Sequence, residues 1–264
     1  MTAVQPPLLA LKGIGKRFGA VQALDGVDFE VHAGEVVGLV GDNGAGKSTL
    51  VKIMSGINPP DRGQISMDGV PVTIRNPDEA TRLGIATVYQ DLALADNLDV
   101  VANLFLGHEE RSTGPARATW QIDETAMEHR SHELLERFAV TIPSVRTEVA
   151  ALSGGQRQQV AVARSLLGEP KLVLLDEPTA ALGVAQTAQV LLLIKQLRER
   201  GLGVMVISHN LADIFEVADR VFVLRLGRPA GTFDVAQASQ DEVVAAITGA
   251  HLRADAVSGN GGRT

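Results

Sequence analysis

Residues 35–56 read EVVGLVGDNGAGKSTLVKIMSG, and this stretch decides the fold. It begins with an apolar run from Glu35 to Val40, which passes into a glycine-rich loop near Gly41. From Lys47 to Met54 the apolar residues recur with helical spacing. An apolar run, a glycine-rich loop and an amphipathic segment predict a buried strand joined to a helix by a tight turn.

The loop itself fits the phosphate-binding P-loop pattern, in the required place between a strand and a helix. Its glycines let successive backbone N–H groups face phosphate oxygens, and the helix dipole adds to the attraction. We expect Lys47 to reach the β- and γ-phosphates and the Ser48 hydroxyl to bind Mg²⁺. The alternative is a merely mobile turn. The predicted nucleotide-binding residues here are Gly41, Asn43, Gly44, Ala45, Gly46, Lys47, Ser48 and Thr49.

Downstream, apolar runs alternate with helical patterns. Lys171 to Leu175, Val204 to Ile207 and Val221 to Leu224 are continuous runs, typical of parallel strands buried on both faces. Between them, Val184 to Arg200 and Leu211 to Ala218 have helical spacing. This order predicts an α/β fold with a mixed, mainly parallel sheet, as in P-loop NTPases.

Two regions depart from that alternation. Near the amino terminus, Leu8 to Lys12 and Leu24 to Val31 read as strands, and Asp68-Gly69 predicts a hairpin between Ile65–Met67 and Val72–Ile74. Gly84 to Tyr89 reads as a further strand. From about residue 91 to 168 the strand signal disappears, which predicts a helical insert. We expect its helices at Asn97 to Leu106 and Asp123 to Phe138, with an exposed loop from Gly107 to Gln121.

The segment KLVLLDE, residues 171–177, places a pair of carboxylates at the carboxyl end of a predicted buried strand. Ligands bind at these strand ends in open α/β sheets. Asp176 suits Mg²⁺ coordination, and Glu177 is placed to polarise an attacking water as a general base. An acidic pair after a strand is more often a loop start or a helix cap. The pair indicates a site for Mg²⁺ and a general base only in combination with the P-loop.

A second helix start follows Leu152. Ser153 is placed to cap the helix, and Gly154 and Gly155 leave backbone donors exposed before an apolar-periodic segment. Read alone, this is only a cap. The full sequence of this start, Leu152-Ser153-Gly154-Gly155-Gln156, matches the signature of ATP-binding-cassette (ABC) proteins.

The order of P-loop, Gln90, LSGGQ, LLDE and His209 resembles the nucleotide-binding domain of ABC proteins, from about residue 8 to 250. The resemblance implies one domain over residues 1–250, with an amino-terminal antiparallel β-subdomain and a helical subdomain at about 91–168. It also implies that Ser153, Gly154, Gly155 and Gln156 of one subunit close over ATP held by another, in a head-to-tail dimer.

Further roles come from the resemblance alone. Phe18 resembles the aromatic residue that stacks on adenine, Gln90 the glutamine that senses metal and γ-phosphate, and His209 the switch histidine. The predicted catalytic residues are therefore Lys47, Glu177 and His209, and the predicted Mg²⁺ ligands are Ser48, Gln90 and Asp176. At Gly183 the sequence departs from the family pattern, which commonly has Asp at this position. The family's Asp helps link the two sites across the dimer, so we expect Gly183 to affect the coupling between them.

Part of the sequence is similar to the ATPases of bacterial monosaccharide importers, most clearly 76–80, 84–92 and Pro178 to Leu182. The resemblance implies ATP and Mg²⁺ as cofactors, integral membrane permease subunits as partners and, indirectly, a solute-binding protein. It also implies pairing with a second copy or another ABC ATPase. Those importers often fuse two cassettes, whereas this sequence holds one.

Composition narrows the choice of partners. The formal net charge of −7 argues against nucleic acid, which is held chiefly by Lys and Arg clusters. The sequence has no cysteine, which suits a reducing compartment. Its longest apolar stretches are far shorter than the roughly 20 residues that span a bilayer. Met1 to Ala10 lacks the features of a signal peptide. We therefore expect a peripheral protein at the cytoplasmic face of the inner membrane, with a disordered tail at 251–264.

Two alternatives stay open at this point. One is a soluble ABC ATPase of nucleic-acid repair or translation, although the coiled coils, zinc hooks and basic arms of such proteins are not visible in the sequence. The other is a nucleotide-binding regulator with an inactive site, against which Glu177 and His209 weigh.

Overall fold

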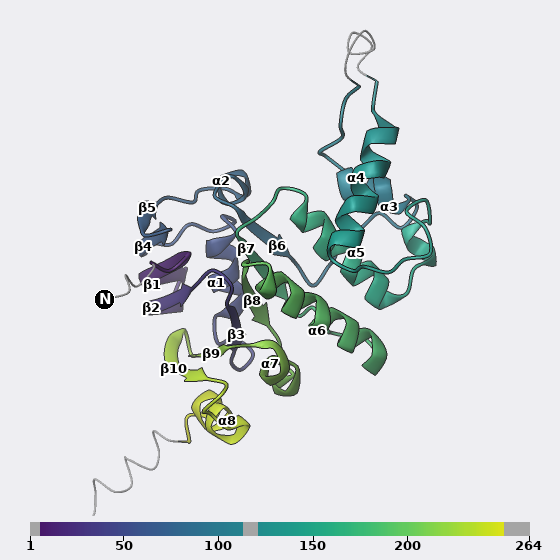
Figure 1. Ribbon diagram of the computed structural model, residues 1–264. Helices are drawn as coiled ribbons and strands as arrows, with labels where there is room; N and C mark the ends of the chain where they lie inside the picture. Colours follow the sequence, from purple (N-terminus) through teal and green to yellow (C-terminus); the bar gives the residue numbers. More distant parts are fainter. Residues whose placement is uncertain (1–5, 113–120, 251–264) are drawn as a thin grey trace, which may run out of the picture.

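The computed structural model describes residues 6–112 and 121–250, and Figure 1 shows its two sheets together with a lobe of helices. The larger sheet has six strands in the order β10-β9-β3-β8-β7-β6. The five strands from β9 to β6 run parallel to one another, and β10 pairs antiparallel with β9 at one edge. The strands are β3 (Val36–Val40), β6 (Ile85–Val88), β7 (Leu172–Asp176), β8 (Gly203–Ile207), β9 (Arg220–Arg225) and β10 (Arg228–Asp234).

Helices cover both faces of this sheet because its strands bury alternate residues on opposite sides. On β7, Val173 and Leu175 belong to the same apolar cluster as α6 (Val184–Glu199). Leu172 and Leu174 belong to the other cluster, with α1 (Lys47–Met54). Shorter helices complete the core: α2 (Pro77–Arg82), α7 (Leu211–Val217) and α8 (Gln240–Thr248).

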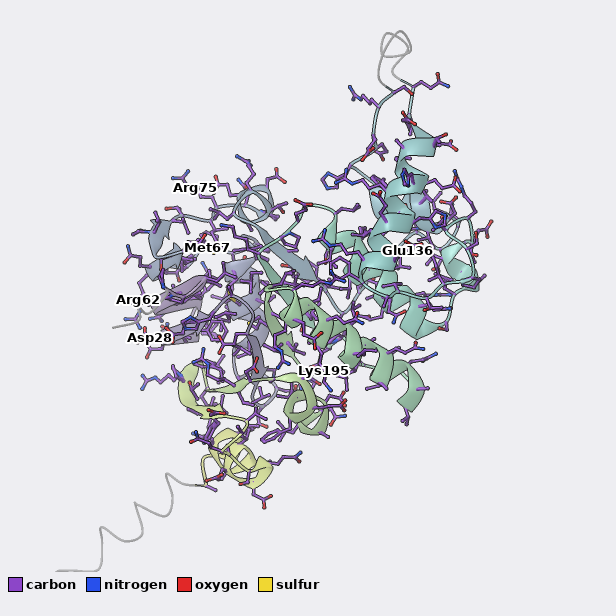
Figure 2. All side chains as sticks on the ribbon, in the orientation of Figure 1. Asp28, Arg62, Met67, Arg75, Glu136 and Lys195 are labelled. Carbon is purple, nitrogen blue, oxygen red and sulfur yellow. The ribbon has the colours of Figure 1, made fainter. Side chains whose placement is uncertain are left out.

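The smaller sheet is antiparallel, with four strands in the order β2-β1-β4-β5. They are β1 (Leu9–Phe18), β2 (Val21–Val31), β4 (Arg62–Met67) and β5 (Val70–Val72). Asp25 ties this sheet to the larger one, because its carboxylate pairs with Arg62 and, at 2.6 Å, with Arg228 of β10. Figure 2 shows Arg62 and Met67 on this sheet, across the molecule from Glu136 on the helical lobe.

The predicted hairpin at Asp68-Gly69 is present, but the prediction for its second strand, Val72–Ile74, was wrong. Asp68 and Gly69 have φ values of 49° and 76°, so both adopt the left-handed conformation of a type I′ turn. A turn of two residues returns the chain at once, and Val70 therefore pairs with Met67 directly.

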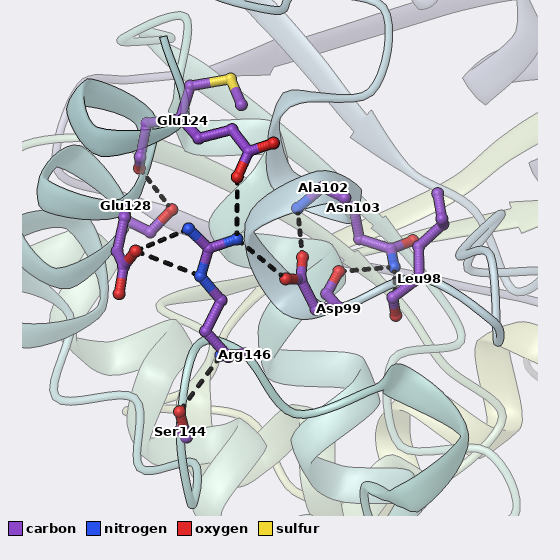
Figure 3. Close-up of polar contacts among 10 residues, drawn as sticks. Leu98, Asp99, Ala102, Asn103, Glu124, Glu128, Ser144 and Arg146 are labelled. Carbon is purple, nitrogen blue, oxygen red and sulfur yellow. Dashed lines mark hydrogen bonds and ion pairs between the residues drawn. The ribbon is translucent and has the colours of Figure 1, made fainter. Parts of the chain in front are cut away.

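The insert is helical, as expected, and contains α3 (Val100–Phe105), α4 (Glu124–Arg137), a 3₁₀ turn (Val149–Ala151) and α5 (Gly154–Leu166). α3 starts three residues after its predicted start, because Asp99 caps it by accepting a hydrogen bond from the Ala102 N–H (2.8 Å). Figure 3 shows Arg146 between this Asp99 and two carboxylates of α4, Glu124 and Glu128. These ion pairs join α3 and α4 to the segment that leads to α5.

The α/β fold with a mixed sheet, an antiparallel β-subdomain and a helical insert is thus confirmed. The single-domain range 1–250 stays a prediction, and the predicted disordered tail lies outside the described residues. None of the described helices combines the length and apolar character needed to cross a membrane.

Leu174 tests the packing of the central sheet, because it is fully buried on β7 against the α1 face. We expect Leu174→Ala to lower the free energy of unfolding by about 2 to 5 kcal/mol, since it leaves a cavity in a rigid core. Leu192 is 55% exposed, so Leu192→Ala is the control and should change that value by about 0.5 kcal/mol or less. Urea titration measures both, and equal effects would contradict the packing described.

Candidate active site

A cavity of about 300 Å³ lies at the carboxyl ends of β3, β7 and β8. Most residues predicted to act together line it: Asn43, Gly44, Ala45, Gly46, Lys47, Ser48, Thr49, Gln90, Asp176, Glu177 and His209. The walls also include Val21, Gln22, Ala23 and Ile207, which sequence reasoning missed. The site is thus built where parallel strands deliver their carboxyl ends to one edge.

The loop before α1 needs glycine because it passes close to its neighbours. A Cβ on Gly41 would lie 2.1 Å from the Leu224 carbonyl oxygen, and one on Gly46 would lie 2.7 Å from that of Ala23. Gly44 has a φ of 78°, and Gly46 a φ of 106°. The Ala45 N–H donates to the Asp42 carbonyl (3.0 Å), and the loop leads directly into the first turn of α1. The first backbone N–H groups of a helix have no intrahelical partner, and such groups bind phosphate.

Lys47 is 7% exposed, and its Nζ donates to the carbonyl oxygens of Gly41 (2.6 Å) and Asp42 (3.0 Å). Burial lowers the pKa of this amine, and the nearby carboxylates of Glu177, Asp42 and Asp176 oppose that shift. The amine is therefore held inside the loop by neutral oxygens, from which an incoming phosphate can attract it.

Glu177 sits in a constrained position directly after β7. Its φ is 51°, a left-handed value that is unusual for a residue with a side chain, and its N–H donates to the Ile207 carbonyl (2.9 Å). Its Oε2 accepts a hydrogen bond from the backbone N–H of His209 (3.4 Å). His209 Nε2 lies 3.1 Å from Oε1 without hydrogen-bond alignment, so this buried oxygen has no hydrogen-bond partner among the described residues.

Both carboxylates of the pair are harder to ionise than usual. Burial raises the pKa of Glu177 against the opposing charge of His209, and burial raises the pKa of Asp176 against that of Lys47. A raised pKa makes Glu177 a stronger base once it is ionised. Because Glu177 lines the cavity, its carboxylate is a place where a water proton can be accepted.

The donor set also fits Mg²⁺. Ser48, Gln90 and Asp176 offer hydroxyl, amide and carboxylate oxygens to one cavity, and hard oxygen donors are what Mg²⁺ takes. In the described ranges, no group of three or more His, Cys, Asp or Glu side chains is arranged so that it could hold a metal ion by itself. Mg²⁺ in nucleotide sites needs no such cage, because it keeps waters and phosphate oxygens as ligands.

The remaining predicted residues lie outside this cavity. Phe18 ends β1, is 46% exposed and has the Lys16 ammonium 5.7 Å from its ring centroid, although its partner across the hairpin, Val21, lines the cavity. The residues of the α5 start do not line the cavity either: Ser153, Gly154, Gly155 and Gln156. One chain therefore does not bring the two helix starts together.

The start of α5 is nevertheless well formed. The Ser153 hydroxyl accepts from the Gln156 N–H (3.3 Å), and the Gln156 side chain accepts from the Ser153 N–H (3.0 Å). Gly155 is buried so closely against Gln186 that an added Cβ would meet the Gln186 Cβ at 2.9 Å. The Gln186 side chain also accepts from the N–H of Gly183 (3.2 Å), so this unpredicted residue joins both segments.

Comparisons with known proteins agree with this geometry. The sequence model of a family described as ABC transporter matches residues 24–180. A fructose import ATP-binding protein of Rhizobium meliloti is 45% identical over 249 residues, covering 93% of this chain and 95% of the relative. A xylose/arabinose import ATP-binding protein of Sulfolobus acidocaldarius is 47% identical over 221 residues, covering 84% and 86%.

A ribose import ATP-binding protein of Rubrobacter xylanophilus is 46% identical over 243 residues, but the match covers 92% of this chain and 47% of the relative. The chain thus spans about half the length of that protein. Among solved structures, a nucleotide-free ATP-binding cassette from an ABC transporter has a TM-score of 0.78 and 25% identity, covering 92% of this chain and 96% of the other. A dimeric cassette bound to ADP and Pi has a TM-score of 0.70 and 26% identity, covering 86% and 98%.

The raised pKa of Glu177 has a consequence for stability. A buried acid that resists ionisation favours the folded state while it is protonated, so stability falls as pH rises through the raised pKa. Glu177→Gln removes the free-energy cost of ionising a carboxyl group at this position. We expect the variant to melt above the wild type at neutral pH, and the difference to shrink as pH falls towards the ordinary value of 4.5.

Thermal unfolding without nucleotide, over a pH series, measures the effect. Glu199→Gln is the control for the loss of a surface carboxylate, because Glu199 is exposed at the end of α6, and it should change the melting temperature at neutral pH little. A Glu177→Gln difference that is constant or negative across the series would contradict a carboxyl group whose pKa is raised by burial.

Proposed function

The chain belongs to the ABC transporter family as an ATP-binding subunit, and from that premise we propose that it hydrolyses ATP in a head-to-tail dimer to power import of a sugar. The observation that carries the proposal is the division of the site. The cavity gathers Lys47, Asp176, Glu177 and His209, while the Ser153 helix start lies outside it. The sugar is supported by the relatives, which are named for fructose, xylose/arabinose and ribose import.

Within one subunit, the loop amides and Lys47 bind the phosphates of ATP. Ser48, Gln90 and Asp176 would hold Mg²⁺, which supplies charge neutralisation of the phosphates when bound. Glu177 orients water and accepts its proton, and the adjacent His209 lies where it can contact the terminal phosphate.

The second half of each site comes from a partner copy or another ABC ATPase. The Ser153 start, with its free backbone donors at Gly154 and Gly155, would close over the phosphate held by the opposite P-loop. ATP then stabilises the closed dimer because it contacts both subunits, and hydrolysis removes that preference. This difference in affinity between the two states is the source of the work.

Membrane partners follow from the premise as well. A second cavity, of about 370 Å³, lies beside the loop after Gln90, with walls that include Tyr89, Leu92, Phe105 and Leu106. Its mixed walls suit a short helix of a permease subunit, and Leu106 is 48% exposed there. The subunit would thus be held at the cytoplasmic face of the inner membrane, with a solute-binding protein as an indirect partner.

Glu177→Gln is the test of the composite site. The variant keeps the shape of the residue but cannot accept a proton, so we expect it to bind ATP and lose about 100-fold or more in turnover. With ATP it should accumulate as a dimer, measured by light scattering after size exclusion. Adding Lys47→Ala to this variant is the control and should abolish the ATP-dependent dimer. A strictly monomeric Glu177→Gln protein that binds ATP would overturn the proposal.

Gly183 tests communication between the two sites. The position has room for a side chain, since an added Cβ would meet only the Gln186 Oε1, at 3.9 Å. We expect Gly183→Asp to change the Hill coefficient for ATP while the half-saturating concentration stays within about twofold, because the new carboxylate lies next to the dimer-facing segments. Gly183→Asn, an uncharged helix cap of equal size, separates charge from capping. Identical Hill coefficients in all three proteins would show that the glycine is inconsequential.

A further inference from the structure

The chain leaves the active site directly after Gln90 and enters the helical insert. Gln90 lines the catalytic cavity, whereas Leu92 and Ala93 contact α5. Arg164, near the end of that helix, donates from Nη1 to the Ala93 carbonyl (2.8 Å) and from Nη2 to the Leu92 carbonyl (3.0 Å). A forked guanidinium thus grips consecutive carbonyl groups just beyond Gln90.

This grip is held under constraint. Ala93 has a φ of 50°, a left-handed value that costs energy for a residue with a Cβ, and its N–H donates to the Asp91 carboxylate (3.3 Å). Burial lowers the pKa of Arg164. The ion pairs of the described residues include none with Arg164, and this half-buried guanidinium instead donates to two backbone carbonyl oxygens. A half-buried cation that binds two consecutive carbonyl groups fixes their position relative to α5.

The rest of the loop is fixed to the insert as well. Asn103 of α3 is fully buried and bonds both the N–H (2.7 Å) and the carbonyl (3.0 Å) of Ala95, as well as the carbonyls of Leu98 and Asp99. Figure 3 shows Asn103 beside Leu98 and Asp99 at the start of α3. On the α5 side, the Arg157 guanidinium lies 3.4 Å from the Asp96 carboxylate. Everything from Leu92 to Asp99 is therefore part of the insert, and only Asp91 separates it from Gln90.

We propose that Arg164 is a positioning residue that locks Gln90 of the active site to the signature helix α5, so that the two cannot move independently. Ser153 begins α5 and Arg164 lies eleven residues further, about 16 Å along the helix. The helix that reaches a partner's nucleotide at one end thus holds the loop that senses its own subunit's nucleotide at the other. The inference rests on the proposed function and assigns this link to one side chain.

The forked geometry is what the link requires. Arginine presents parallel N–H donors in a rigid plane, whereas lysine is a flexible point charge that cannot span two carbonyl groups in the same way. Arg164→Lys keeps the charge and loses the fork, and Arg164→Met keeps the length and loses both. Arg130→Met is the matched control, since Arg130 is an arginine of α4 that pairs with Glu110 and the Leu167 carbonyl rather than with the carbonyl groups that follow Gln90.

Hydrogen exchange gives the first measurement. In Arg164→Met, we expect the amide of Ala93 to exchange about tenfold faster or more, because the turn loses its anchor, while strands β3 and β7 keep their protection. Arg164→Lys should fall between this variant and the wild type. Arg130→Met should leave the amide of Ala93 unchanged. Unchanged protection of Ala93 in both Arg164 variants would overturn the inference.

Kinetics gives the second measurement, and it separates positioning from general damage. We expect Arg164→Met to bind ATP with wild-type affinity and to lose about 10-fold to 100-fold in kcat, since small misplacements of a positioned group cost that much. Arg130→Met should keep its kcat within about twofold of wild type. Equal losses in both variants, or a loss of ATP affinity that matches the loss of kcat, would overturn the assignment. Should Arg164→Met not fold, Arg164→Lys carries both measurements.

A third comparison separates this inference from the proposed function. Each Arg164 variant is combined with Glu177→Gln, and the ATP-dependent dimer is measured against Glu177→Gln alone. If Glu177→Gln alone fails to dimerise, the proposed function fails whatever Arg164 does. A different result would overturn only the link through Arg164. In that result Glu177→Gln dimerises with ATP, the combined variants dimerise with the same ATP dependence, and the single Arg164 variants keep the hydrogen exchange and turnover of the wild type.

Discussion

The structure depends on two helix starts, because the first backbone N–H groups of a helix lack intrahelical partners and can bind an anion. At Lys47 the loop reaches this state only because Gly41 and Gly46 pass against the carbonyl groups of Leu224 and Ala23, where a Cβ does not fit. The second helix start is that of α5, where Ser153 is the cap. Ser153 and Gln156 exchange hydrogen bonds between their side chains and backbone N–H groups there. Phosphate binding at these starts follows from dipole and geometry, and the rest of the fold holds them in place.

The active site places charged groups of both signs close together around the first helix start. Lys47 donates to loop carbonyls, and Asp176 and Glu177 sit beside it with pKa values that burial raises. The site therefore combines a buried cation with buried acids that are reluctant to ionise, and a phosphate with its metal would compensate both. The left-handed φ of Glu177 shows that the backbone is strained where the base is placed, as often occurs at functional positions.

Much of the fold could be predicted because strong local patterns dictate it. Continuous apolar runs gave β7 and β8, the P-loop fixed α1, and the acidic pair marked the strand end that lines the cavity. The elements that the sequence did not predict are α2, β10 and α8. Helix α2 has six residues, β10 contains Pro229 and Gly231, and α8 has nine residues of which only Val243 and Ala246 are buried. Val21 to Ala23, Gln186 and Arg164 could not be found either, because their roles come from contacts between distant segments.

The central claim is that two helix starts from different copies meet over one triphosphate, and the absence of cysteine from the sequence permits a direct measurement. Asn43→Cys and Ser153→Cys are made in separate chains that both carry Glu177→Gln, mixed with ATP, and treated with a short thiol-reactive linker. The account predicts a covalent dimer that forms in the mixture, requires ATP, and is absent when Lys47→Ala is added to both chains. Failure to form this dimer, while ATP binding to both chains is intact, would contradict the account.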